Sequence, residues 1–203
     1  MKLLAIDCAT EACSVALFDG DERVAADHRV LGRGHAEHLV PMIAALPDRG
    51  RADRIMVSRG PGSFTGVRIG IAAARALGVA WRAERLGYPT LALIAAMARA
   101  ERGALPISVA MTGGHGEWFV QGFGSDGLPQ GPHRSLTPDD AVMGAKHDLV
   151  AGTKAEEFVA LRGRGEALPM HPDARHALSL PSALITADVT AIYGRPPDAR
   201  PAA

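Results

Sequence analysis

The chain has 203 residues, and its 22 basic and 22 acidic side chains give a formal net charge of zero. This balance argues against a protein that binds nucleic acid by itself, because such proteins usually carry a basic excess. Hydrophobic residues make up 47% of the chain and aromatic residues only 4%, so we expect a core of alanine and aliphatic side chains, large enough for one domain or two lobes.

No apolar run has the length of a membrane span, and the N-terminus lacks the basic and apolar regions of a signal peptide. Cys8 and Cys13 are the only cysteines, and they lie in or beside apolar segments. This placement favours buried thiols over a disulfide or a metal pair. The sequence therefore predicts a cytoplasmic protein without membrane contact.

The N-terminal segment predicts a β-meander of three strands, over Lys2–Asp7, Ser14–Phe18 and Arg23–His28, with a hairpin turn at Asp19-Gly20-Asp21. A helix from about His35 to Leu46 follows. The three- and four-residue spacing of its apolar residues makes one hydrophobic face. That face consists of Leu39, Met42, Ile43 and Leu46.

Residues 60–70 have the sequence Gly-Pro-Gly-Ser-Phe-Thr-Gly-Val-Arg-Ile-Gly and lie between a short apolar run and a long alanine-rich run. This pattern predicts a turn that joins a strand to a helix, with Ser63 or Thr65 capping the helix. A tight, capped turn explains the sequence, and so does a site for phosphate or another anion at the helix N-terminus. It is not a Walker loop, because no Lys-Ser/Thr follows the last glycine.

The helix after this turn is predicted from about Thr65 to Glu84. Its apolar residues and its small residues recur every three or four positions, so another helix could approach closely. With the helix at 35–46 it forms a candidate surface for a partner protein; the alternative is that both helices cover the chain's own sheet. The candidate partner-binding residues on this second helix are Val67, Gly70, Ile71, Ala74 and Gly78.

A third helix at about Leu91–Arg102 precedes a second α/β pattern. That pattern comprises strands at Ile107–Met111, Trp118–Phe123 and Asp148–Ala151, a hairpin within 124–138, helices at about 139–144, 155–162 and 174–188, and a proline-rich tail at 195–203. We therefore expect an N-terminal lobe over residues 1–104 and a smaller C-terminal lobe over 105–203, whose last helix packs back on the first lobe. Two lobes that each open with a β-hairpin favour an actin/hexokinase-like arrangement over a dinucleotide-binding fold.

Several segments together resemble the bacterial TsaB (YeaZ) family. They are the eleven residues at 60–70, Asp7-x-x-Thr10, His35-Ala36-Glu37-His38-Leu39-Val40-Pro41-Met42-Ile43, Thr90-Leu91 and Ile192-Tyr193-Gly194-Arg195-Pro196. The resemblance is strong over roughly the first hundred residues. It implies an α/β actin-like ATPase fold (ASKHA, ribonuclease H-like) with two lobes, the second of them reduced.

The resemblance also implies a role. Family members are non-catalytic subunits that pair with the paralogous TsaD and join the ATPase TsaE in a larger complex. The complex transfers a threonylcarbamoyl group from its adenylate to the N6 amine of the tRNA adenosine next to the anticodon. This chain would then bind no cofactor alone, ATP and metal being used by its partners. It would contact tRNA only indirectly and form a homodimer when isolated.

The residues agree with a role outside catalysis. The catalytic paralogue holds a metal with a His-x-x-x-His pair, whereas the matching segment here, Leu86–Ala92, contains no histidine. His35, Glu37 and His38 do not have the His-Glu-x-x-His spacing of metallopeptidases, and we interpret them as residues on the outer face of the helix. Ser63 has no neighbouring histidine in the sequence to act as a base. We expect no catalytic residue and no metal ligand.

Nucleotide binding is the remaining chemistry to consider. Actin-like ATPases contact metal-bound phosphates with an aspartate on the first strand and a hydroxyl in the next turn, and Asp7 and Thr10 match these in outline. Cys8-Ala9 replaces the glycine-rich turn, however, and Thr112-Gly113-Gly114 stands where relatives commonly have Asp-Ala-Arg. Asp7 is alternatively the acceptor that closes the first hairpin. A nucleotide-dependent kinase-like enzyme is the second hypothesis, and a metallopeptidase is the third.

Overall fold

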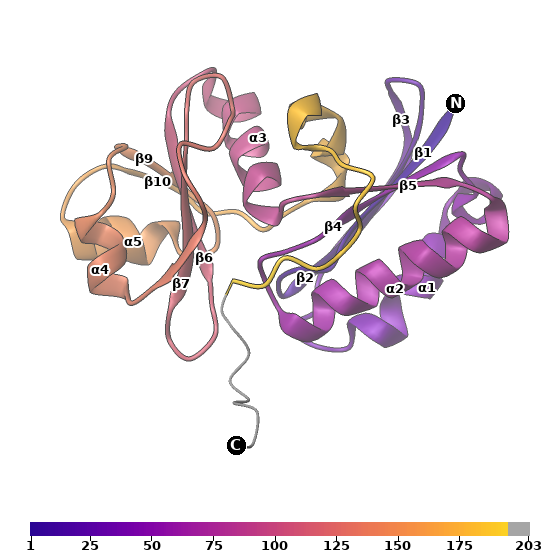
Figure 1. The fold of residues 1–203 in the computed structure, drawn as a ribbon, viewed down its shortest axis with the longest axis horizontal. Helices are drawn as coiled ribbons and strands as arrows, with labels where there is room; N and C mark the ends of the chain where they lie inside the picture. The colour runs from indigo at the N-terminus through magenta and orange to yellow at the C-terminus, as the bar shows by residue number, and fades with distance from the viewer. Residues whose placement is uncertain (195–203) are drawn as a thin grey trace.

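The structure, a computed structural model, describes residues 1–194, which form two lobes built on two five-stranded sheets (Figure 1). In the first lobe the predicted meander is confirmed. The antiparallel strands β1 (Lys2–Asp7), β2 (Ala12–Asp19) and β3 (Glu22–Val30) are joined by β4 (Arg54–Ser58) and β5 (Glu84–Tyr88), which run parallel to β1. The strand order is β3-β2-β1-β4-β5.

Helices α1 (His35–Ala45) and α2 (Phe64–Trp81) contact each other and cover one face of this sheet; a short 3-10 turn, η1 (Pro47–Gly50), follows α1 (Figure 1). Strand residues alternate between the two faces, so Leu4, Ile6 and Val57 lie under α1 and α2. Leu3, Ala5 and Met56 face the opposite side, where α3 (Thr90–Arg102) and the 3-10 turn η2 (Ala174–Ser179) pack.

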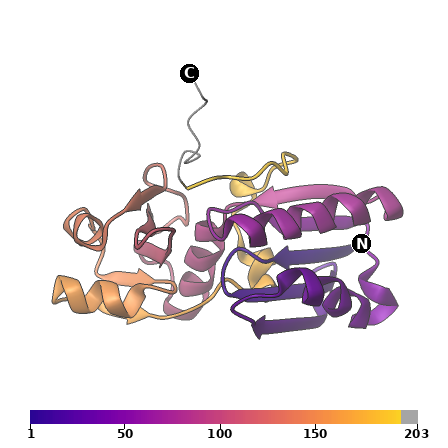
Figure 2. The same cartoon turned by 90° about the horizontal axis from the view of Figure 1, so that it is seen from below.

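The second lobe repeats this strand order as β8-β7-β6-β9-β10. One face of its sheet packs on α3, so α3 lies between the two sheets, as the view in Figure 2 also shows. Two short helices cover the other face. The elements are β6 (Ile107–Thr112), β7 (Trp118–Phe123), β8 (Arg134–Leu136), α4 (Pro138–Met143), β9 (Leu149–Ala151), α5 (Ala155–Arg162) and β10 (Glu166–Leu168).

Two of the predicted helices differ from those in the structure. The helix predicted to reach Glu84 ends at Trp81, because Arg82 adopts a left-handed conformation (φ 56°), and the chain then forms β5. The helix predicted over 174–188 is replaced by η2, a second 3-10 turn η3 (Ser182–Leu184) and extended chain. Pro181 accounts for this break, since proline has no backbone N–H and disfavours a helical residue before it.

The segment after β10 nevertheless contacts the first lobe: η2 lies against β1 and β2, and the Ala174 N–H donates to the Ser14 hydroxyl (3.0 Å). The predicted fraying of 195–203 concerns residues outside the described part. No helix among residues 1–194 is both long enough and apolar enough to cross a membrane.

Candidate functional site

Asp7, a candidate nucleotide ligand, is a buried residue at the end of β1. Its Oδ1 accepts a hydrogen bond from the Ala9 N–H (2.9 Å), and its Oδ2 accepts one from the Tyr88 hydroxyl (3.1 Å). The same hydroxyl lies 3.0 Å from the Ile6 carbonyl oxygen. Asp7 therefore acts as the acceptor that closes the first hairpin turn, which is the alternative interpretation of the sequence.

Burial determines the charge of this carboxyl group. It raises the pKa of Asp7 from 3.8 to about 6, although the hydrogen bonds from the Ala9 amide and the Tyr88 hydroxyl act in the opposite direction. Burial and the neighbouring Asp7 also raise the pKa of Tyr88 well above its ordinary value, so Tyr88 stays protonated and can donate.

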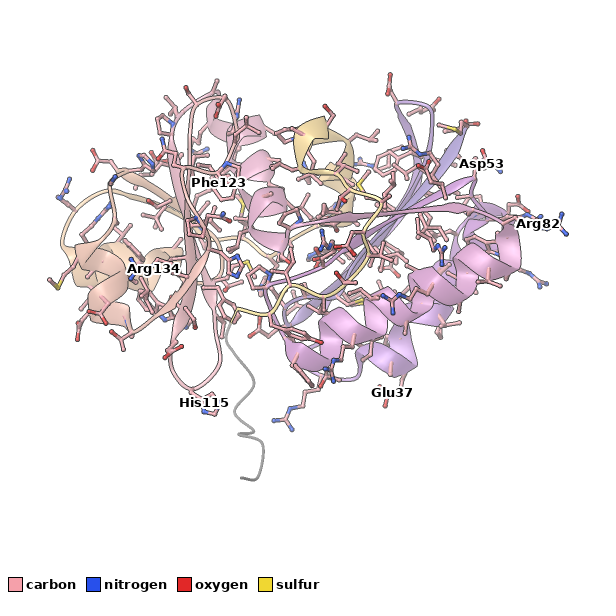
Figure 3. All side chains as sticks on the ribbon, in the orientation of Figure 1. Glu37, Asp53, Arg82, His115, Phe123 and Arg134 are labelled. Carbon is pink, nitrogen blue, oxygen red and sulfur yellow. The ribbon has the colours of Figure 1, made fainter. Side chains whose placement is uncertain are left out.

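Thr10, the second candidate ligand, is also used within the turn. Its Oγ1 accepts a hydrogen bond from the Ala12 N–H (3.2 Å), and its carbonyl oxygen lies 2.8 Å from Nε2 of His35. The interpretation of His35 as an outer-face residue is therefore wrong, since it is buried and attaches the start of α1 to the turn. Glu37 and His38 are exposed as expected, and Figure 3 shows Glu37 on the outside of the helix.

The segment 60–66 lies directly on the first hairpin turn. The Ser63 N–H donates to the Ala9 carbonyl (2.7 Å), and the Ser63 hydroxyl accepts from the Gly66 N–H (3.2 Å), which confirms Ser63 as the N-cap of α2. A methyl group at Gly62 would lie 2.1 Å from the Ala9 carbonyl oxygen, and one at Gly66 would lie 2.0 Å from that of Cys8. The glycines are needed because two backbone segments touch here.

The nine residues predicted to bind a partner lie on the inner faces of α1 and α2, or directly after α1, against the chain's own sheet. Their side chains are buried with the core residues of β1, β2 and β4. Gly70 faces Val57, and Gly78 lies under the side chain of Arg85. The small-residue stripe thus brings α2 close to its own sheet, and the assignment of a docking surface to these residues is corrected. They are Leu39, Met42, Ile43, Leu46, Val67, Gly70, Ile71, Ala74 and Gly78.

Cys8 and Cys13 are free and buried, as predicted, with their sulfur atoms 3.5 Å apart. Among residues 1–194, no three His, Cys, Asp or Glu side chains are grouped so that they could hold a metal ion. The buried hydroxyl oxygens of Ser58, at the end of β4, and Thr90, at the start of α3, are 2.6 Å apart. Hydrophobic periodicity does not reveal Tyr88 or Ser58, since both lie on strands of only five residues.

The second lobe places Thr112-Gly113-Gly114 at the start of the turn between β6 and β7. The Thr112 N–H donates to the Thr153 hydroxyl (2.9 Å), and the Gly113 N–H donates to the Glu117 carbonyl (2.9 Å). Gly114, His115 and Gly116 are exposed at the tip, where Figure 3 labels His115. This turn is therefore a simple hairpin without a helix over it.

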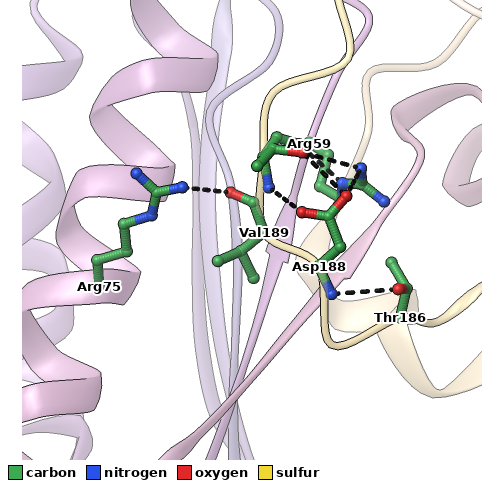
Figure 4. A network of polar contacts seen from close by, with 6 residues as sticks. Arg59, Arg75, Thr186, Asp188 and Val189 are labelled. Carbon is green, nitrogen blue, oxygen red and sulfur yellow. Dashed lines mark hydrogen bonds and ion pairs between the residues drawn. The ribbon is translucent and has the colours of Figure 1, made fainter.

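A C-terminal strap, residues 186–194, runs across the first lobe (Figure 4). Arg59 forms an ion pair with Asp188 (2.6 Å), and Arg75 donates to the Val189 carbonyl (3.3 Å). At its end, Tyr193 accepts hydrogen bonds from Arg68 and lies against the ring of Phe64. Two arginines of α2, Arg68 and Arg75, therefore hold this strap.

Comparisons with known proteins agree with this geometry. A family model described as TsaD, tRNA N6-adenosine threonylcarbamoyltransferase, matches residues 29–127. The tRNA threonylcarbamoyladenosine biosynthesis protein TsaB of Escherichia coli is 39% identical over 124 residues, which are 59% of this chain and 53% of that protein. The aligned part thus spans about half of the curated relative.

Solved structures match over a greater length. YeaZ from Pseudomonas aeruginosa has 29% identity and a TM-score of 0.79, covering 95% of this chain and 99% of that one. A second structure, titled as an uncharacterized protein from Pseudomonas aeruginosa with similarity to peptidase YEAZ, has 31% identity and a TM-score of 0.75, covering 88% and 89%. The chain belongs to the TsaB (YeaZ) family.

The fold class is also confirmed. Beyond the family, the ethanolamine utilization protein EutJ from Carboxydothermus hydrogenoformans matches with a TM-score of 0.50 at 12% identity, a likeness of fold alone. The chain has the two-lobed actin-like α/β fold, with sheets of the same strand order and shorter helices in the second lobe.

Proposed function

We propose that this chain is a non-catalytic subunit that docks on TsaD, in a larger complex with TsaE, and supports threonylcarbamoyl transfer to tRNA. The proposal rests on the turn after β1, whose polar groups are already bonded within the chain. Asp7 and Thr10 are bonded to the chain's own backbone, and the carbonyl groups of Cys8 and Ala9 face the glycines of the 60–66 segment. A phosphate group would have to displace these contacts.

Docking is assigned to the outward faces of α1 and α2. Val40 on α1 and Val79 on α2 are 61% and 74% exposed, and both helices also carry exposed alanines. Small apolar residues on two neighbouring helices let a second pair of helices approach closely and bury apolar area. Exposed alanines on these faces are Ala36, Ala44, Ala72, Ala76 and Ala80.

Reconstitution tests the role. TsaD, TsaE and the enzyme that makes the adenylate donor, all from the same organism, are assayed by mass spectrometry of the modified nucleoside with and without this chain. We expect modification only when the chain is present. Turnover of a threonylcarbamoyl donor or of ATP by the purified chain alone would contradict the proposal.

A pair of variants tests the surface. Val79→Glu places a charge on the outward face of α2, whereas Met143→Glu changes an equally exposed residue (84%) on α4 in the other lobe. We expect Val79→Glu to weaken TsaD binding at least tenfold in calorimetry and Met143→Glu to leave it unchanged. Size-exclusion chromatography of the chain alone tests the homodimer, which the same variant should weaken. Equal TsaD affinity for both variants would move the interface elsewhere.

A further inference from the structure

The outer face of the second sheet contains a hollow of about 260 Å³ that the proposed function does not use. It lies between β7, the loop before β8, the loop after α4, and α5. The lining of this hollow is mainly apolar, so it suits an apolar part of a ligand. The apolar side chains that line it include Val120, Leu136, Ala141 and Phe158.

Two features of the sequence open this hollow. Helices α4 and α5 have only six and eight residues, so they cover part of the sheet and leave the end near Ser108 and Gly122 free. Gly122 pairs with Ser108 across β6 and β7 and has no side chain to fill the gap. A methyl group on Gly122 would lie 3.5 Å from both Gln130 Oε1 and His147 Nε2, which marks the opposite wall.

Hydrogen bonds hold the rim in place. His147 Nε2 lies 2.7 Å from Gln130 Oε1 and joins the loop after α4 to the loop before β8. The Gln121 side-chain amide donates to the Gly131 carbonyl (2.9 Å), which fixes the second loop on β7. Because these bonds connect three separate segments, the hollow is formed before any ligand arrives, and binding needs little additional ordering.

The charge around the hollow is positive. Arg134 and Lys146 are exposed lining residues; Arg134 begins β8, which contacts α4 (Figure 3). None of the lining residues is acidic, and within residues 1–194 no carboxylate is paired with either cation. Burial and the neighbouring Lys146 lower the pKa of His147, so its ring is neutral near pH 7 and can keep its bond to Gln130.

We propose that this hollow is a binding site for a compact organic anion with an apolar body, of the size of a benzoate ion. The apolar floor would take the ring, and Arg134 and Lys146 would attract the carboxylate at the rim. The volume lies just below the usual range of pockets for drug-sized ligands, which limits the site to a small molecule. This assignment does not depend on the role in tRNA modification.

Nuclear magnetic resonance titration of the whole chain tests it with three probes. Benzoate carries both the ring and the charge, benzamide carries the ring alone, and acetate carries the charge alone. We expect saturable shifts at the Gly122 amide, the Gln121 side-chain amide and the His147 ring with benzoate, at an affinity at least tenfold higher than for the other two. No saturable shift at these groups, or equal affinity for benzoate and benzamide, would overturn the proposal.

A charge variant separates this site from general attraction of anions. The double variant Arg134→Gln/Lys146→Gln removes both rim cations, and Arg33→Gln/Arg51→Gln removes two exposed cations of the first lobe. We expect the first to weaken benzoate binding at least tenfold and the second to leave it within twofold. Equal loss in both variants would assign the effect to net charge and overturn the site.

A steric variant tests the floor. Gly122→Ala adds a methyl group at ordinary contact distance from the opposite wall, so the fold is retained while part of the hollow is filled. Gly114→Ala is the control, because nothing lies within 4 Å of its added methyl. We expect at least threefold weaker benzoate binding for Gly122→Ala with an unchanged melting temperature. Unaltered binding in the folded variant would exclude this hollow.

Discussion

The turn after β1 and the turn after β6 occupy the same place in two sheets of the same strand order, yet their surroundings differ. In the first lobe the 60–66 segment lies on the turn, and the Ser63 amide is bonded to Ala9. In the second lobe Gly114 and Gly116 have nothing within 4 Å of the positions their Cβ atoms would take. One turn is covered and the other is exposed to solvent.

The difference lies in the segment that follows the neighbouring parallel strand. After β4 the chain makes a glycine-rich turn and enters an 18-residue helix, whose first residues lie on the hairpin. After β9 the corresponding loop bonds to the end of β6, through Thr153 to Thr112 and through the Lys154 amide to Ala110, and then enters an 8-residue helix. The same sheet topology therefore produces a closed site in one lobe and an open turn in the other.

Replacing a glycine by alanine should reduce the free energy of unfolding strongly in the first turn and hardly at all in the second. Gly66→Ala would place a methyl group 2.0 Å from the Cys8 carbonyl oxygen, and the helix must move to relieve this overlap. We expect a loss of about 3 kcal/mol or more in the free energy of unfolding, measured with urea. Gly114→Ala has open space around it, and its effect should stay within about 0.5 kcal/mol.

Similar losses for the two variants would contradict the contrast between a covered and an exposed turn. A small effect at both positions would mean that the 60–66 segment does not hold the first hairpin. Melting followed at 222 nm and by tryptophan fluorescence would show whether Gly66→Ala unfolds the first lobe alone, since Trp118 lies in the second sheet and Trp81 on α2.

The charge of Asp7 should make the covered turn sensitive to pH. Because its pKa rises from 3.8 to about 6 on folding, the folded chain binds a proton between these values that the unfolded chain releases. Its contribution to stability is full below about pH 3.8 and is lost as pH rises through about 6. Relative to Asp7→Asn, which keeps the shape, the free energy of unfolding should fall by about 2 kcal/mol from pH 4.5 to 7.5.

Urea titrations of both proteins at several pH values in this window measure the effect. Other titrating groups, such as the Glu157 carboxyl whose pKa the hydrogen bond from Lys154 lowers, are present in both proteins and cancel in the difference. Parallel stability curves for the two proteins would show that Asp7 titrates no differently in the folded and unfolded states.

Tyr88→Phe should destabilise the covered turn by a smaller amount. The substitution leaves the buried ring in place and removes the hydroxyl that bonds to Asp7 and lies 3.0 Å from the Ile6 carbonyl. Leaving buried acceptors without a donor costs about 1–3 kcal/mol. The pKa of Asp7 should rise further, which carbon-detected NMR titration of the carboxyl group would measure. An unchanged pKa would contradict the bond.

The sequence predicted those parts of the structure that local pattern determines. The Asp-Gly hairpin, the apolar face of α1 and the Ser63 cap each depend on residues within one or two turns of chain. The resemblance to the TsaB (YeaZ) family added the actin-like fold class. The strands that the sequence did not predict, β5, β8 and β10, are short and lack the continuous apolar run that indicates the equally short β9.

The site could be predicted only in part, because its contacts join distant segments. Periodicity shows that Ile71 and Gly78 share a face of α2, but only the position of β5 shows that this face meets the chain's own sheet. His35 looked like an outer residue because its partner, the Thr10 carbonyl, is a backbone atom 25 residues away. At Gly66 two backbone segments approach each other closely, and the glycine itself is the only sign of this contact in the sequence.

We expect the smallest effect on stability at Tyr193, where the C-terminal strap joins the first lobe to the second. Tyr193 bonds to Arg68 with its hydroxyl and rests on Phe64, and the next residue, Gly194, lies against Phe119 of β7. All three side chains around the hydroxyl are exposed to solvent, so water replaces the lost bonds in Tyr193→Phe. We expect a change within about 0.5 kcal/mol, or about 2 °C in melting temperature, against the larger loss at the buried Tyr88. A loss at Tyr193→Phe as large as that at Tyr88→Phe would mean that the strap, rather than the buried turn, determines the stability of the first lobe.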